Sequence, residues 1–147
     1  MDILIVLLVL LAGAMAPTQA GINSLLSQVL KSNLLAALVS FAVGTLALVS
    51  YALVLRLKWP PVHQLVHTPW WIWLGGLCGA FLVTVTIMAV PKLGATAMFA
   101  FFLAGQMAAS LILDHFGLLG YPIHPLNLWR CIGVAMVVGG VLLIRAH

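Results

Sequence analysis

Charged residues are scarce in this chain, which has six Lys and Arg and two Asp and Glu among 147 residues. An ordinary soluble domain carries roughly 25% charged residues, whereas this chain is 5% charged and 65% hydrophobic. These values exclude a soluble globular domain, and apolar runs of about 20 residues indicate an integral membrane protein. The GxGxxG and Walker A patterns are also missing. Their absence argues against an ATP-driven pump acting alone, and we expect no enzymatic activity.

Five apolar segments are long enough to cross a membrane. A helix that rises ~1.5 Å per residue needs about 20 residues to cross an apolar layer of ~30 Å. We therefore predict an all-α integral membrane fold, with residues 1–147 forming a single transmembrane domain and residues 91–94 forming one of its tight turns. The predicted helices cover about 3–30, 34–55, 70–90, 95–113 and 128–144.

The Lys and Arg residues flank these segments and divide equally between the two sides of the membrane. An odd number of spans sets Arg56, Lys58 and Arg130 on the N-terminal side against Lys31, Lys92 and Arg145 on the other. Because Lys and Arg in short loops fix the orientation of a membrane protein, this balance predicts insertion in both orientations. A single orientation is the alternative. Since the cations lie at lipid headgroups, we expect the bilayer as a partner and no nucleic acid.

The first segment carries more polar residues than any other span. Gln19, Asn23 and Ser27 repeat every four residues, so they share one face of a helix. The free energy cost of exposing such side chains to lipid points this face inward. Pro17 precedes them and cannot donate the backbone hydrogen bond to residue 13, so we expect a kink there. Hydrogen bonding between helices is the alternative use of these side chains.

Polar residues in two other segments complete a predicted substrate site. Gln106 lies near the middle of the fourth segment, and Ser40 shares a face of the second segment with Gly44. No Asp, Glu, Lys, Arg or His lies deep within a segment, so the cavity is expected to suit neutral, zwitterionic or anionic substrates better than hydrophobic cations. The predicted substrate-binding residues are Thr18, Gln19, Asn23, Ser40 and Gln106.

Small residues spaced four or seven apart mark the faces on which helices are expected to pack closely. They occur in the third, fourth and fifth segments. The predicted packing residues are Gly75, Gly76, Gly79, Ala100, Ala104, Ala108, Gly133 and Gly140.

Metal and cofactor sites are not expected. His63 and His67 have the i, i+4 spacing of a helical metal site, but no acidic or thiol side chain lies near them in sequence. We predict no metal and no cofactor.

Several motifs give the chain a family resemblance over nearly its whole length. They are GAMAPTQAGINSLL, LAALVSFAVGTLAL, PWWIWLGGLCGA, PKLGAT and AGQMAASLILDHFGLLG. With them the chain resembles the YdcZ-type proteins of the drug/metabolite transporter superfamily. The resemblance extends distantly to the small multidrug resistance exporters, but their first-helix glutamate has no counterpart here, since Pro17 to Gln19 occupy the comparable region.

The resemblance implies a multi-pass bacterial inner membrane protein whose five-helix protomer is half of a ten-helix transporter. Two inverted copies would form an antiparallel homodimer around a substrate site at mid-depth. We expect secondary-active transport or export of a small polar metabolite or drug-like molecule by alternating access. Two alternatives remain open: a dual-topology small-ion channel, and an accessory subunit of a heteromeric transporter.

Overall fold

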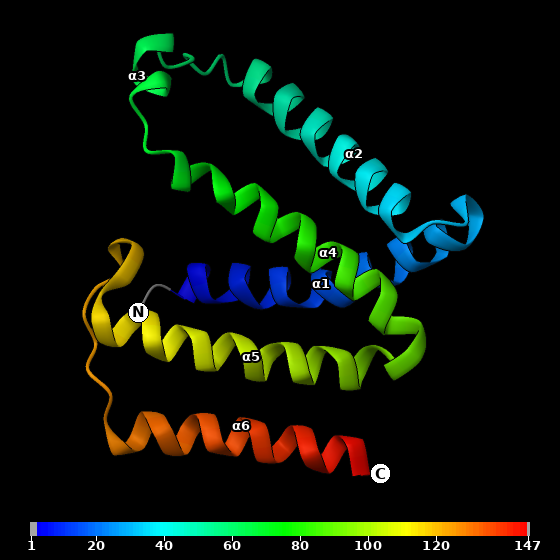
Figure 1. The fold of residues 1–147 in the computed structure, drawn as a ribbon, viewed down its shortest axis with the longest axis vertical. Coiled ribbons are helices and arrows are strands. Elements are labelled where there is room, and N and C mark those ends of the chain that lie inside the picture. Colours follow the sequence, from blue (N-terminus) through cyan, green and yellow to red (C-terminus); the bar gives the residue numbers. More distant parts are fainter. Residues whose placement is uncertain (1–2, 147) are drawn as a thin grey trace. The chain divides into compact units, whose positions relative to one another are not determined.

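The computed structural model describes residues 3–146 of the chain, which fall into two compact units, Met1–Pro91 and Lys92–His147 (Figure 1). Within the described residues every regular element is a helix and no strand occurs, which confirms the all-α prediction. Asp2 lies outside the described residues, as do the side chains of Ile144 and Arg145.

The first unit begins with a pair of long helices, α1 (Ile3–Leu30) and α2 (Asn33–Val54). The chain leaves α1 at Lys31, whose φ of 52° is left-handed, and the Ser32 N–H donates to the Ser27 carbonyl at 3.2 Å. The Ser32 hydroxyl then caps α2 by accepting from the Leu35 N–H at 3.3 Å. This bonding satisfies backbone groups at both helix ends within a very short connection.

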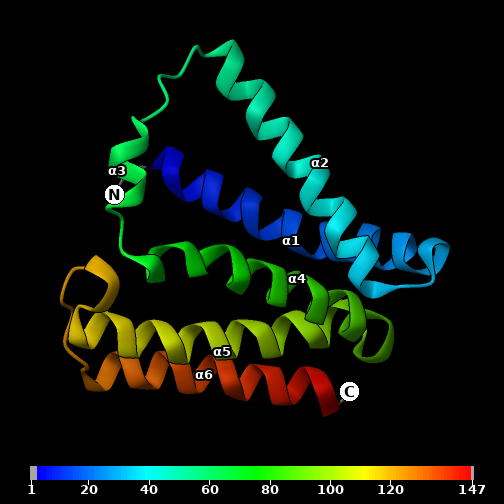
Figure 2. The ribbon, with the colours of Figure 1, turned by 45° about the horizontal axis from the view of Figure 1, so that its top comes forward.

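The core of the first unit lies near this connection, where α4 (Leu74–Leu93) joins α1 and α2 (Figure 2). The buried Ala36 and Ala37 of α2 pack with Val83 and the fully buried Ile87 of α4. Leu26 and Leu30 of α1 pack against the same cluster. The core of the first unit is thus a small apolar cluster of side chains from three helices.

The connection between α2 and α4 contains short helical turns. Arg56, with a φ of 51°, ends α2, and the Leu57 N–H donates to the Ala52 carbonyl at 3.0 Å. A short helix, α3 (Val62–Val66), and a 3-10 turn, η1 (Trp70–Trp73), follow before α4 begins. The third predicted helix therefore starts with a 3-10 turn at Trp70.

The turn predicted at residues 91–94 is shorter than expected. Helix α4 continues through Pro91 and Lys92 to Leu93, and only Gly94 separates it from α5 (Ala95–Phe116). Proline removes one backbone bond but has a helical φ, so Pro91 does not end the helix. Gly94 has φ 77° and ψ 157°, a combination essentially restricted to glycine.

The second unit is an antiparallel pair formed by α5 and α6 (Leu128–Ala146), joined through the 3-10 turn η2 (Leu118–Gly120) (Figure 2). Gly117 ends α5 with a φ of 60°. A Cβ at this position would lie 2.6 Å from Ile123 Cγ1, so the turn requires glycine for space as well as conformation.

Among residues 3–146, four helical stretches have the length and composition to span a membrane: Ile3–Leu30, Asn33–Val54, Trp70–Leu93 and Ala95–Phe116. The apolar part described for α6, Leu128–Leu143, is shorter. Most large apolar side chains on these helices are exposed in the single chain, for example Leu46 and Phe81. Such surfaces are typical of helices that face lipid or another membrane helix.

Candidate functional site

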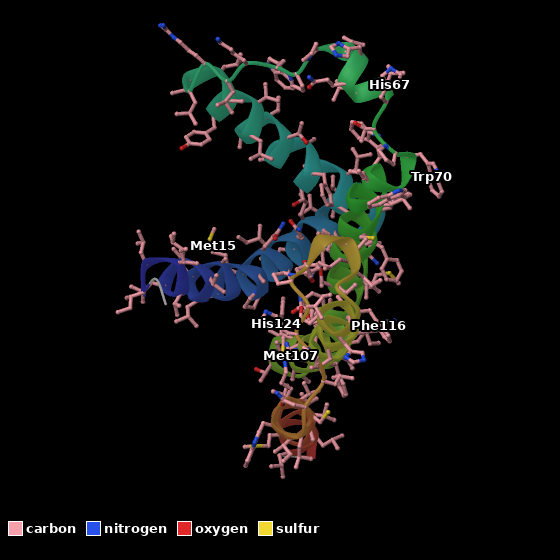
Figure 3. The ribbon with its side chains drawn as sticks, turned by 90° about the vertical axis from the view of Figure 1, so that its left-hand side faces the viewer. Met15, His67, Trp70, Met107, Phe116 and His124 are labelled. Atoms are coloured by element: carbon pink, nitrogen blue, oxygen red, sulfur yellow. The ribbon has the colours of Figure 1, made fainter. Side chains whose placement is uncertain are left out.

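A groove between α1 and α2 contains most of the predicted site residues. It encloses about 550 Å³, within the 300–1,000 Å³ typical of small-molecule sites. Figure 3 shows the Met15 side chain projecting from α1 toward the side on which α2 lies. The residues that line the groove are Met15, Thr18, Gln19, Ile22, Asn23, Leu26, Val39, Ser40 and Val43.

Four of the five predicted substrate-binding residues meet in this groove. Thr18, Gln19 and Asn23 come from α1, and Ser40 comes from α2. The helical repeat explains this arrangement, since residues three and four apart share a face. The Thr18 hydroxyl also donates to the Ala14 carbonyl at 3.2 Å, one turn earlier in its own helix.

Asn23 has an unusual environment in the groove. Its side chain is only 4% exposed, and its Nδ2 has no hydrogen-bond partner among the described residues. Leaving a buried donor unpaired costs about 1–3 kcal/mol. Ser27, one turn further along α1, is also buried, but its hydroxyl donates to the Ser24 carbonyl at 2.7 Å. The face predicted from the sequence thus holds one satisfied and one unsatisfied buried polar group.

A second, smaller cavity continues from the groove along α2. It encloses about 220 Å³ and is lined by Gln19, Ser40, Phe41, Gly44, Thr45 and Leu48. Gln19 and Ser40 line both cavities and therefore lie where the two meet. Gln19 is exposed and Ser40 is half-buried, so the Gln19 carboxamide can reach a molecule in either cavity.

The walls of both cavities lack ionisable side chains in the part of the chain that the structure describes. The chemistry available there is hydrogen bonding by two carboxamides and two or three hydroxyls, against apolar surface. Such walls can bind and orient a molecule through hydrogen bonds and apolar contact.

The fifth predicted residue, Gln106, lies on α5 in the second unit, where it is exposed and lines neither cavity. Pro17 lies inside α1, which runs unbroken from Ile3 to Leu30. The kink at Pro17 stays a prediction.

The predicted packing residues differ in how close their neighbours lie. A Cβ at Gly79 would lie 3.5 Å from the ring of Phe41 of α2, an ordinary van der Waals distance. At Gly75, Gly76, Gly133 and Gly140, a Cβ would meet no described atom within 4 Å. Ala100 and Ala104 of α5 are half-buried, and Ala108 is exposed. Most of these small residues are therefore open on the surface of the single chain.

The apolar walls of the groove were not predicted as site residues. Ile22 and Leu26 lie one turn apart on α1, and Ile22 lies three residues after Gln19. In the sequence, only their position beside the polar face of α1 indicates that they line the groove. Apolar residues are so common in this sequence that the signal did not stand out.

Asp114, His115 and Arg130 lie at the ends of α5 and α6 that the connecting loop joins, and His124 of that loop lies beside the end of α5 (Figure 3). Arg130 forms a salt bridge with Asp114 and donates to the His124 carbonyl at 2.7 Å. The Leu126 N–H donates to His115 Nδ1 at 3.1 Å. Asp114 thus anchors the loop. Within the described residues no group of three or more His, Cys, Asp or Glu could hold a metal ion.

A family model described as "Putative inner membrane exporter, YdcZ" matches residues 4–143. The chain belongs to the YdcZ family. This confirms the resemblance drawn from the motifs, and the match includes both units and the whole groove. The YdcZ-family protein is a multi-pass inner membrane protein. No curated protein and no solved structure was found to match the chain.

Proposed function

We propose that this YdcZ-family protein is a secondary-active exporter that moves a small polar metabolite or drug-like molecule across the inner membrane by alternating access. The observation that carries the proposal is the unpaired Asn23 amide at the wall of the α1–α2 groove. A polar group buried in a membrane span needs a partner in protein, water or a bound molecule, because lipid cannot satisfy it. A bound substrate would complete its hydrogen bonds.

The proposed assembly is an antiparallel homodimer of five-helix protomers, forming a ten-helix bundle. The apolar part of helix α6, Leu128–Leu143, is about 24 Å long at ~1.5 Å per residue, and we propose it as a fifth, shorter span. An odd number of spans and the equal division of Lys and Arg both favour inverted copies. The open glycines of α4 and α6 offer faces on which a second protomer can pack.

In the proposed mechanism, the groove opens to one side of the membrane and then to the other as α1 flexes at Pro17. Gln19 and Ser40, which line both cavities, would pass the molecule between them. Thr18, Gln19, Asn23 and Ser40 replace the water of hydration that the molecule loses on entry. The fifth predicted residue, Gln106, would contribute from α5 in the assembled dimer.

Purified protein in liposomes tests this function. A screen of polar metabolites and drug-like molecules is expected to find a compound whose exchange is slow and saturable. Flux that rises linearly with concentration and carries current would indicate a small-ion channel. If no compound moves until a related protein is added, the chain is an accessory subunit.

A further inference from the structure

We infer that the α1–α2 groove selects uncharged amphipathic molecules that carry a hydrogen-bond acceptor, such as the carbonyl of an amide, beside a short apolar chain. This inference rests on the proposed function and names its substrate class. The inference is based on the side-chain amide of Asn23, a buried and unpaired hydrogen-bond donor in a largely apolar wall.

The donor at the groove wall defines the polar end of the molecule. Asn23 Nδ2 has no hydrogen-bond partner among the described residues, and Asn23 is only 4% exposed. Once the Asn23 side chain turns toward the groove that it lines, an acceptor oxygen placed against Nδ2 would remove the free energy cost of an unpaired buried donor. A molecule with donors alone would leave Nδ2 unpaired.

The remaining walls define the apolar end. Ile22 and Leu26 of α1 face the groove together with Val39 and Val43 of α2, and Met15 lies at its far end on α1. These side chains provide no hydrogen bonds. A hydrophobic chain of a few carbons would fill the space that they enclose.

The absence of charge from the described groove residues excludes ions of either sign. A charged group moved into such a site loses its hydration and meets no counter-ion, which is strongly unfavourable. The next cation along α1 is Lys31, eight residues beyond Asn23. This separation is about 12 Å along the helix axis, too far for direct pairing. Neutral molecules are therefore favoured over both ammonium ions and carboxylates.

A small molecule fits this site better than a partner helix does. The backbone carbonyls of a transmembrane helix already accept bonds within the helix, so a partner would need a polar side chain at this depth. The carbonyl of a lipid ester has the same chemistry as a free amide, since both place an acceptor beside an apolar chain. The experiment below separates these two sources.

The test titrates the full chain in nanodiscs made of ether-linked lipids, which carry no ester carbonyl. The probes are N-hexylacetamide, hexylamine and hexanoate. Ligand-observed NMR measures the binding of each probe. N-hexylacetamide is expected to bind saturably, and the two charged probes at least tenfold more weakly. This comparison uses the unaltered protein and so does not depend on any variant folding.

A variant then assigns the binding to Asn23. Asn23→Leu keeps the size of the side chain and removes the donor, and it should weaken N-hexylacetamide binding roughly 5- to 150-fold. Gln28→Leu is the matched control, since Gln28 is an exposed amide of the same helix and lines neither cavity. It should leave binding unchanged. Circular dichroism and the oligomeric state check that both variants fold.

Repeating the titration in ester-linked lipids identifies the source of the carbonyl. Weaker binding of N-hexylacetamide in ester-linked lipids would mean that lipid esters bond to Asn23 Nδ2 and compete with the probe. Equal binding would mean that the natural ligand of Nδ2 is a free amphiphile. Equal affinity for a charged probe, or unchanged binding in Asn23→Leu, would overturn the inference. So would loss of the dimer in Asn23→Leu, because Asn23 would then bond to a second copy. If N-hexylacetamide does not bind but another compound is transported saturably, the substrate class is wrong and the transporter stands.

Discussion

Arg130, near the start of α6, forms a salt bridge with Asp114, near the end of α5. The same guanidinium donates to the His124 carbonyl, and the His124 N–H donates to the Asp114 carbonyl at 2.8 Å. The Asp114 residue thus holds both the following loop and the next helix. The Asp114–Arg130 salt bridge thus holds the loop to its flanking helices. Neither residue lines the α1–α2 groove.

We predict that breaking the Asp114–Arg130 pair lowers stability by about 1 kcal/mol, the scale of a partly exposed ion pair. Both side chains are below one-third exposed, at 22% for Asp114 and 30% for Arg130. A double-mutant cycle of Asp114→Ala and Arg130→Ala, read by unfolding in mixed micelles, gives the coupling energy. Lys58→Ala, at an exposed cation, should change little. A coupling energy of zero would show that the pair does not hold the loop.

Gly94 is predicted to be the least replaceable residue of the connection between α4 and α5. Its φ of 77° and ψ of 157° are unfavourable for other residues, so Gly94→Ala should destabilise the protein by about 1–3 kcal/mol. Gly105→Ala is the control, because Gly105 lies within α5 and has open space around it. Alanine there should be neutral or stabilising by up to about 1 kcal/mol. Thermal unfolding of the two variants in detergent compares them directly, and equal stability would be evidence against a strained Gly94.

Orientation in the membrane is predicted to depend on few charges. Adding three Lys after His147 should draw the C-terminal side into the cytoplasm and remove the opposite orientation. Reporters fused to the C-terminus should be active on both sides of the membrane before the change and on one side after it. Adding three Ser is the control. If the reporter on the unmodified protein is active on one side alone and the added Lys have no effect, the protein inserts in a single orientation.

Inverted assembly is open to a cross-linking test. In an antiparallel dimer, the start of a helix in one protomer lies at the depth of the end of that helix in its partner. Cysteine pairs at Gly75 with Val90 on α4, or at Gly133 with Leu143 on α6, should cross-link between protomers in a background without Cys78 and Cys131. Pairs at equal positions near the helix ends, such as Gly75 with Gly75, are the control. Cross-linking of the equal pairs alone would indicate a parallel dimer.

The sequence predicted the helices well because each long apolar run had to pair its backbone groups internally. It predicted the ends less well. Pro91 and Lys92 were expected in a turn, but α4 continues through both to Leu93, and only Gly94 separates it from α5. The left-handed φ of Lys31 and of Arg56 had no sequence signal, since most such positions hold glycine.

The site was predictable to the extent that it lies on one helix face. Gln19 and Asn23 are four residues apart, so their shared face followed from the helical repeat alone. Ser40 joins them because α2 packs back along α1 after a short connection. Ser27 donates to a carbonyl of its own helix whereas Asn23 Nδ2 has no partner, a difference that appears only in the structure.

Transport by variants of the groove tests the central claim most directly. Gln19→Ala and Asn23→Ala should each lower the apparent affinity for the exported compound in liposomes roughly 5- to 150-fold, because each removes a hydrogen bond in a site shielded from water. Folding and dimerisation should be preserved. Asp114→Asn, which alters the loop and not the groove, should leave that affinity nearly unchanged. Transport that is intact in both amide variants and lost in Asp114→Asn would contradict the account and move the chemistry to the α5–α6 loop.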